Sequence, residues 1–164
     1  MILSILKSLS LGVWLGSLLM LGAAVAAPIF QELPSKTLAG HLNGIILSRM
    51  NLIEWVCGTL AFISSVVLLA MNWNGEFRTL RIIETALVFV MISILWIYST
   101  RITGRMNDLR QTIGDFDHPQ ETTEYVQAKA EFDDLHKAYT KLVGINMILI
   151  TSTFVLSIVN TRPG

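Results

Sequence analysis

Residues 131–159 read EFDDLHKAYTKLVGINMILITSTFVLSIV, a charged half that runs without a proline into an apolar half. Successive residues of an α-helix lie about 100° apart, so side chains three and four positions apart share a face. This spacing places five residues on one face: Phe132, His136, Tyr139, Val143 and Asn146. We therefore expect a helix that enters a membrane with a polar stripe, formed by His136, Tyr139 and Asn146, turned toward other helices.

The rest of the chain has the same character. Its 164 residues are 52% hydrophobic and only 15% charged, and the twelve acidic residues balance the twelve basic ones. The mean hydropathy is +0.58. Runs without any charged residue cover 8–31, 55–75, 85–100 and 142–161. Because a spanning helix needs roughly 20 apolar residues, these runs predict four transmembrane helices.

We expect one all-α domain over residues 1–164, a four-helix transmembrane bundle. The predicted spans are about 3–27, 50–72, 79–100 and 140–160, and the first is expected to stop at Pro28. The prolines and turn residues place the second helix from Ser35, the third to about Ile113 and the fourth from about Glu121 to Asn160. Helices two, three and four are longer than the bilayer is thick, so they should extend into a helical head, residues 35–49 and 101–139, on one side.

The first run has two interpretations. An early Lys, an apolar stretch and Ala24-Val25-Ala26 are typical of a cleaved signal peptide, but the stretch is as long as a membrane span. We favour a retained helix. Its small residues recur at a spacing that lets helices approach closely in lipid, and they are the predicted helix contact: Gly12, Gly16, Gly22 and Ala26.

Basic residues are unequally divided between the two sides of the predicted bundle. Eight lie on the head side: Lys36, Arg49, Arg101, Arg105, Arg110, Lys129, Lys137 and Lys141. Four lie on the other: Lys7, Arg78, Arg81 and Arg162. The positive-inside rule favours a cytoplasmic head, whereas the signal-like first helix favours the opposite orientation, so the orientation stays open.

Three elements resemble the transmembrane protein 205-like family of small four-helix membrane proteins. They are Trp14-Leu15-Gly16, the stretch IYSTRITGRMNDLR at 97–110, and Phe132-x-x-x-His136 followed by Asn146. The resemblance implies a polytopic membrane protein, with a bacterial branch that is largely a domain of unknown function. For the eukaryotic branch it also implies an association with tolerance of metal-containing drugs. It implies no established chemistry.

A soft-metal site at the head-side mouth of the bundle is one hypothesis. Met50, Glu54 and Cys57 share a face of the second helix, and thiol, thioether and imidazole groups suit ions such as copper(I). His136 and His41 belong to the same side of the membrane. The spacing lacks a tight ligand pair such as Cys-x-x-Cys, and buried polar side chains mainly need a hydrogen-bond partner. We therefore favour packing roles for these residues.

Charged residues near the bilayer are functional candidates because burying them in lipid is costly. We expect Glu54 to pair with Arg101 or Lys141, and Glu84 to pair with Arg81. The two carboxylates lie near opposite membrane surfaces, which excludes a catalytic dyad. A membrane oxidoreductase is disfavoured because no His lies in the middle of a predicted span.

These patterns favour a multi-pass membrane protein without enzymatic activity, in the inner or plasma membrane if the source is bacterial. We expect an oligomeric scaffold or accessory component whose partners are the lipid bilayer and further copies or other membrane proteins. The alternative is a metal-handling or transport-related protein. The sequence predicts no cofactor beyond that possible metal ion, and no basic-aromatic surface for nucleic acid.

Overall fold

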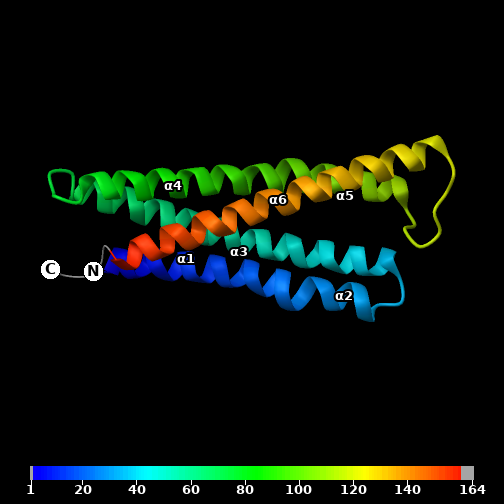
Figure 1. The fold of residues 1–164 in the computed structure, drawn as a ribbon, viewed down its shortest axis with the longest axis horizontal. Helices are drawn as coiled ribbons and strands as arrows, with labels where there is room; N and C mark the ends of the chain where they lie inside the picture. The colour runs from blue at the N-terminus through cyan, green and yellow to red at the C-terminus, as the bar shows by residue number, and fades with distance from the viewer. Residues whose placement is uncertain (1, 160–164) are drawn as a thin grey trace.

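The computed structural model describes residues 2–159 as one elongated bundle of roughly parallel helices (Figure 1). The first helix comprises α1 (Ile2–Met20), the π-helical turn η1 (Leu21–Val25) and α2 (Ala26–Glu32). The second is α3 (Lys36–Met71). The third comprises α4 (Arg78–Trp96), the π-helical turn η2 (Ile97–Ile102) and α5 (Thr103–Ile113), and the fourth is α6 (Thr123–Val159).

Within residues 2–159 four helices are long and apolar enough to cross a membrane, and no strand is present. The all-α prediction is therefore confirmed. The second and third helices have 36 residues each, about 54 Å at 1.5 Å per residue, against a hydrocarbon layer of about 30 Å. Large apolar side chains on the outside, such as Leu52, Phe89 and Ile148, are exposed, as lipid-facing residues would be.

The prediction that the first helix stops at Pro28 was wrong, because the helix continues to Glu32. The reason is the π-helical turn just before the proline, where the Ala26 N–H donates to the carbonyl of Leu21, five residues earlier. A new α-helical segment begins at Ala26, so Pro28 lies in its first turn. Proline is tolerated there because its missing N–H has no helical partner to lose. The predicted end of the last helix at Asn160 lies outside the described residues.

The core is densest where α1, α3, α4 and α6 cross. Trp14, Met91, Leu95 and Ile150 are fully buried there. Gly58 on α3 makes room for the indole, since a Cβ at this position would lie only 3.1 Å from the Trp14 ring. The first helix therefore supplies central side chains to the bundle.

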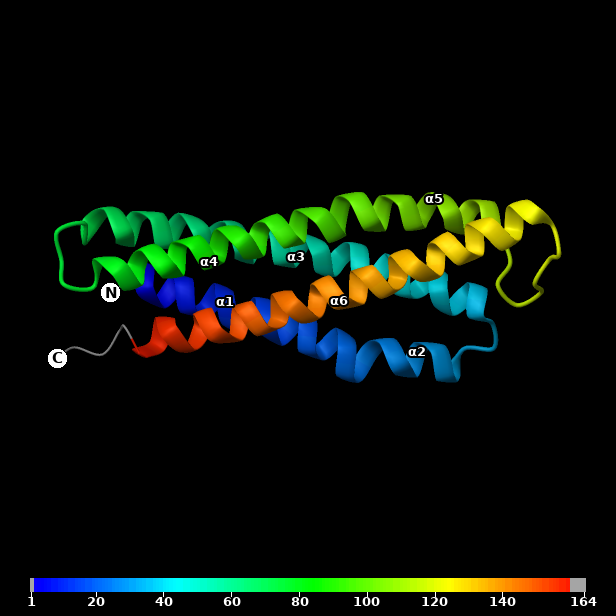
Figure 2. The same cartoon turned by 45° about the horizontal axis from the view of Figure 1, so that its top comes forward.

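Toward the end that carries the α5–α6 loop, the helices separate. Figures 1 and 2 show α6 diverging from α2, while α2 packs against the start of α3. On α5 and α6 a smaller apolar cluster of Leu109, Ile113 and Tyr125 holds the outer ends of these helices together. This divergence opens a space between the first helix and α6.

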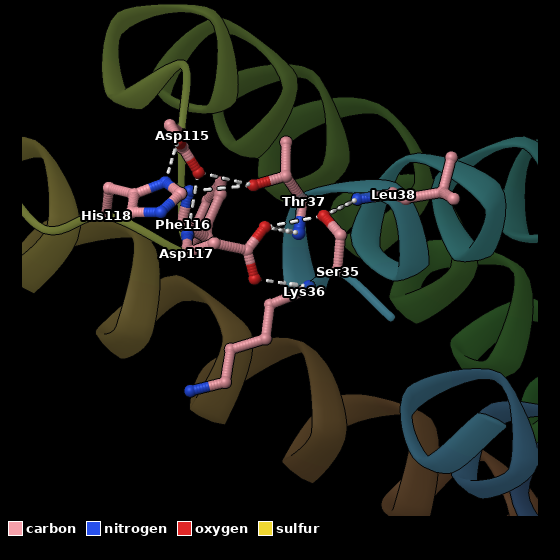
Figure 3. A network of polar contacts seen from close by, with 8 residues as sticks. All are labelled: Ser35, Lys36, Thr37, Leu38, Asp115, Phe116, Asp117 and His118. Atoms are coloured by element: carbon pink, nitrogen blue, oxygen red, sulfur yellow. Dashed lines mark hydrogen bonds and ion pairs between the residues drawn. The ribbon is translucent and has the colours of Figure 1, made fainter. Parts of the chain in front are cut away.

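The α5–α6 loop is attached to the start of α3 by two carboxylates and one backbone amide (Figure 3). The Thr37 hydroxyl donates to Asp115 at 3.0 Å and accepts from the Phe116 N–H at 2.8 Å. Asp117 accepts hydrogen bonds from the Ser35 hydroxyl at 2.5 Å, the Lys36 N–H at 2.6 Å and the Thr37 N–H at 3.2 Å. The first N–H groups of a helix lack partners within the helix, and its positive end favours an anion. Ser35 also caps the helix by accepting from the Leu38 N–H.

We expect Asp117→Ala to loosen the first turn of α3, while the Thr37 hydroxyl still holds Asp115 and Phe116 of the loop. Hydrogen exchange of the Lys36 and Thr37 amides should become several-fold faster, because both lose their acceptor. Hydrogen-exchange mass spectrometry of the peptide at 33–40, corrected for intrinsic rates, measures this effect. His118→Ala is the matched control, since His118 is 87% exposed and contacts only the neighbouring Asp115 in the same loop. Equal exchange in the two variants would contradict the assignment.

The same contact has a defined pH dependence. The hydrogen bond from Ser35, with those from the two amides, holds the pKa of Asp117 well below its usual range. Its contribution is therefore present above the ordinary carboxyl pKa and is lost only as the pH falls through the lowered value. Asp115 raises the pKa of His118, so their contact is complete below the ordinary His pKa and is lost as the pH rises through the raised value. Raising the pH from 6 to 9 should leave exchange at Lys36 and Thr37 protected.

Candidate functional site

A buried carboxylate lies in the middle of the bundle. Glu54 on α3 is 1% exposed and accepts a hydrogen bond from the Trp14 indole N–H at 3.0 Å. The Tyr98 hydroxyl, from η2 of the third helix, donates to the same Glu54 oxygen. Both donors are fully buried. Three helices are thus joined through one oxygen atom. We call these three side chains, together with Asn146 of the fourth helix, the Glu54 cluster.

The fourth helix completes the cluster. The Asn146 side-chain amide donates to the Tyr98 hydroxyl at 3.5 Å, and the Tyr139 ring packs edge-on against the Tyr98 ring with centroids 5.4 Å apart. Within residues 2–159 the Asn146 carbonyl oxygen and the Tyr139 hydroxyl are buried without a hydrogen-bond partner. Tyr98 lies in a π-helical turn, a feature that often occurs at functional sites.

The predicted partners of Glu54 were wrong. Arg101 is exposed with its guanidinium 5.1 Å from the Trp96 ring centre, and Lys141 is also exposed. Long basic side chains at this level reach outward to the interface, where they keep their hydration. Neutral donors from the bundle interior satisfy the carboxylate instead. Neither Tyr98 nor the role of Trp14 at this site was predicted from the sequence. The signal for both was an aromatic donor within an otherwise apolar stretch, which usually finds a partner when buried.

A second buried polar group lies at the opposite end of the bundle. Lys7 on α1 is fully buried and its ammonium group is 2.8 Å from Glu84 on α4. Arg81 is 3.3 Å from the same carboxylate oxygen, as the sequence predicted. The sequence predicted only that Lys7 lies on the side opposite the head, and its contact with Glu84 was not predicted. The hydroxyl groups of Ser8 and Ser157 are 3.0 Å apart beside this pair.

A cavity of about 940 Å³ opens where the first helix and α6 diverge. Its inner wall, toward the middle of the bundle, is apolar and contains Leu18, Leu47, Val143 and Met147. Its outer wall, toward the α5–α6 loop, carries Lys36, Arg110, Lys129 and Asp133. Glycines at 22, 40, 44 and 144 line it and leave space that side chains would fill. We call this space the head-side cavity, and its volume falls in the range of small-molecule sites, about 300–1,000 Å³.

Four residues of the predicted α6 stripe, Phe132, His136, Tyr139 and Val143, line this cavity. The fifth residue of the stripe, Asn146, instead belongs to the Glu54 cluster, where it contacts Tyr98. Tyr139 lines the cavity, and its ring also contacts the ring of Tyr98. The floor of the cavity is therefore adjacent to the Glu54 cluster.

The predicted metal ligands are distributed over several environments. Cys57 and Glu54 are buried in the bundle, Met50 is half-buried, His136 borders the cavity and His41 is exposed. Among the described residues no three His, Cys, Asp or Glu side chains gather where they could share one ion.

The small residues of the first helix also have different environments. A Cβ at Gly12 would meet Phe154 of α6 at 3.6 Å, so this glycine lies at a contact within the chain. At Gly16 and Gly22 nothing lies within 4 Å of that position. Gly22 and Ala26 border the head-side cavity, and Gly16 is exposed on the outer face. Self-association through this face stays a prediction.

Comparison with protein families gives one match. The model described as "Domain of unknown function (DUF4149)" matches residues 9–112, more than half of the 164 residues. The matched part includes Trp14, Glu54, Tyr98 and Arg110, whereas α6 lies beyond it. Comparisons with curated proteins and with solved structures find no match. The link to the transmembrane protein 205-like family therefore stays a resemblance.

Proposed function

We propose a function from the premise that the chain belongs to the DUF4149 family, a domain of unknown function. The protein is a non-enzymatic, multi-pass accessory component of the membrane that holds an amphiphilic molecule from the bilayer in its head-side cavity. The observation that carries this proposal is the direction of polarity along the cavity wall. Apolar side chains lie toward the middle of the membrane bundle, and charged ones lie toward the α5–α6 loop.

This gradient matches the order of groups in a membrane lipid. Leu18, Leu47 and Met147 offer an apolar surface at the inner end of the cavity, where it meets the predicted membrane spans. Lys36 and Lys129 lie toward the end that extends past the hydrocarbon layer. The inner end of the cavity borders the predicted membrane spans, at Leu18, Val143 and Met147, so acyl chains could enter it from the bilayer while the headgroup stays at the level of the head.

The Glu54 cluster supports a role in holding the helices rather than in catalysis. Glu54 receives hydrogen bonds from two fully buried aromatic side chains on two other helices. Interhelical hydrogen bonds of this kind contribute roughly 0.6–2 kcal/mol each in membranes. A carboxylate engaged in this way fixes the relative positions of α1, α3 and the third helix, and so fixes the floor of the cavity.

We expect Gly144→Leu to weaken lipid retention. Gly144 lines the cavity and has open space beyond it, so a leucine there would occupy the volume of an acyl chain. Forcing an acyl chain and a leucine into the same volume costs about 1–3 kcal/mol, so retention should fall roughly fivefold to 150-fold. The measurement is native mass spectrometry of protein in mild detergent with an equimolar mixture of dioleoyl phosphatidylcholine and dioleoyl phosphatidylglycerol, counting total lipid bound per chain.

Gly104→Leu is the matched control. Gly104 is an exposed glycine of α5 outside the cavity wall, and nothing lies within 4 Å of its Cβ position. Both substitutions place leucine in a helix, where it is favoured over glycine by about 0.5–1 kcal/mol, so neither is expected to unfold the protein. If the wild-type protein retains no lipid, or if both variants lose it equally, the proposed function is wrong.

A further inference from the structure

We propose that the molecule in the head-side cavity is an anionic phospholipid whose phosphate binds the Arg110 guanidinium. The inference rests on the proposed function and adds the chemistry of the headgroup. Its acyl chains lie toward Leu18, Leu47 and Met147, and the phosphate lies where the wall changes from apolar to charged.

Arg110 is a cation held in the cavity wall without a counter-charge. It is half-buried, and no carboxylate of residues 2–159 is within ion-pair distance of it. Its Nη1 donates to the Asn107 side chain at 3.2 Å, and its Nε is buried without a hydrogen-bond partner in the described chain. A half-buried guanidinium without a carboxylate partner favours an anionic ligand at the part of the group that faces the cavity.

The surroundings of Arg110 fix its position. Its guanidinium lies 5.7 Å from the centre of the Phe132 ring on α6. On the other side it reaches α3 at Gly44, where a Cβ would be only 2.6 Å from Nη1. The absence of a side chain at Gly44 therefore provides the space for the guanidinium between α3 and α6. A planar guanidinium with free N–H groups suits a phosphate, which it can bind through two hydrogen bonds.

The other charges of the wall favour the same sign of ligand. Lys129 is neutralised by Asp133, at 2.6 Å. Lys36 has no described carboxylate within ion-pair distance, and its side chain extends away from the Asp117 contacts (Figure 3). Lys36 and Arg110 thus leave two positive charges on the wall that the described chain does not balance. Basic pockets between membrane helices are the usual binding sites for anionic lipid headgroups.

A metal cation or an apolar helix would fit the cavity less well than an anionic lipid. A metal cation would be repelled by these two groups, and an apolar helix from a second copy would bury Arg110 still without an acceptor. An anionic phospholipid supplies both the acyl chains for the apolar part and the acceptor for Arg110.

The test compares dioleoyl phosphatidylglycerol with dioleoyl phosphatidylcholine, which differ in net charge and share their acyl chains. Each lipid is titrated separately into wild-type protein, Arg110→Gln and Arg101→Gln, with binding read by native mass spectrometry. Wild-type protein should prefer phosphatidylglycerol about fivefold or more, as expected for one basic group at a membrane surface. Arg110→Gln should lose most of that preference, because only Lys36 then stays unbalanced on the wall. It should bind phosphatidylcholine nearly as the wild type does, because the choline group of that lipid already balances its phosphate. Arg101→Gln, an exposed arginine on the same side that lies over Trp96, should keep it.

Each outcome has one meaning. Equal binding of the two lipids by the wild type, or an unchanged preference in Arg110→Gln, overturns the headgroup assignment and leaves the proposed function intact. Unchanged phosphatidylcholine binding in Arg110→Gln shows that the variant is folded. If neither lipid binds and the wild type is a dimer, the cavity belongs to a second copy of the chain, and both proposals fail.

Discussion

Replacing Glu54 by leucine is expected to lower the free energy of unfolding by about 2–4 kcal/mol. The substitution leaves the Trp14 N–H and the Tyr98 O–H, both fully buried, without their shared acceptor. A buried donor left unpaired costs about 1–3 kcal/mol, and hydrogen bonds between membrane helices contribute roughly 0.6–2 kcal/mol. The removal of a carboxyl group from the apolar interior offsets part of the sum. Unfolding by denaturant in mixed micelles measures the difference.

The variant Glu54→Gln distinguishes the effect of the hydrogen-bond acceptor from the effect of the negative charge. Its side-chain carbonyl can accept both hydrogen bonds from the position of the original oxygen, so Glu54→Gln should remain within about 1 kcal/mol of the wild type. Glu76→Leu, an exposed carboxylate in the α3–α4 turn, controls for the loss of an acidic residue. If glutamine destabilises the protein as much as leucine does, the ionised carboxylate and not the hydrogen bonds holds the three helices.

The helices themselves were predictable because lipid imposes a simple rule on composition. The runs without charge at 8–31, 55–75, 85–100 and 142–161 each lie within one of the four long helices, apart from the ends beyond the described residues and the turn after Met71. Ile113 was predicted as the end of the third helix and is its last residue, since Gly114 follows with a positive φ of 68°. Glycine adopts this conformation without steric cost, and it commonly follows helix ends.

The partner of Glu54 could not be derived from the sequence. Helical spacing states which residues share a face, but it does not give the rotation of one helix against the next. Arg101 and Lys141 were reasonable partners by charge and depth, whereas Trp14 is 40 residues away on a helix whose rotation was unknown. The cost of removing water from a cation explains the observed partners of Glu54. Two neutral donors lie inside the bundle, and the basic side chains stay hydrated outside it.

The head-side cavity was equally beyond prediction. It depends on the angle at which α6 leaves the first helix and on glycines at 40, 44 and 144 that line the gap. The sequence did identify the α6 stripe of Phe132, His136, Tyr139 and Val143, which forms one wall. What it could not indicate was that α2, after the π-helical turn at Leu21–Val25, follows α3 and leaves this stripe uncovered.

The Lys7–Glu84 pair carries the second large expected effect. Lys7→Met should lower the free energy of unfolding by about 3 kcal/mol, since breaking a buried ion pair typically costs 3–5 kcal/mol and Arg81 remains beside the carboxylate. The double variant Lys7→Met/Glu84→Gln should recover much of that loss, because a buried pair replaced by uncharged side chains is often neutral in its effect on stability. Unfolding in mixed micelles measures the four members of this double-mutant cycle.

The control for this cycle is a surface pair of the same chemistry. Lys137 lies 3.0 Å from Asp134 on α6 with its side chain 68% exposed, and removing an exposed pair costs only about 0–1 kcal/mol. Lys137→Met should therefore leave stability nearly unchanged. A loss in Lys7→Met no greater than in this control would mean that Lys7 reaches water in the membrane. A double variant as unstable as Lys7→Met alone would instead mean that the lysine acts through packing of its aliphatic chain and not through Glu84. The cycle thus separates charge from packing at the one place where α1 and α4 are joined by a buried ion pair within the described residues.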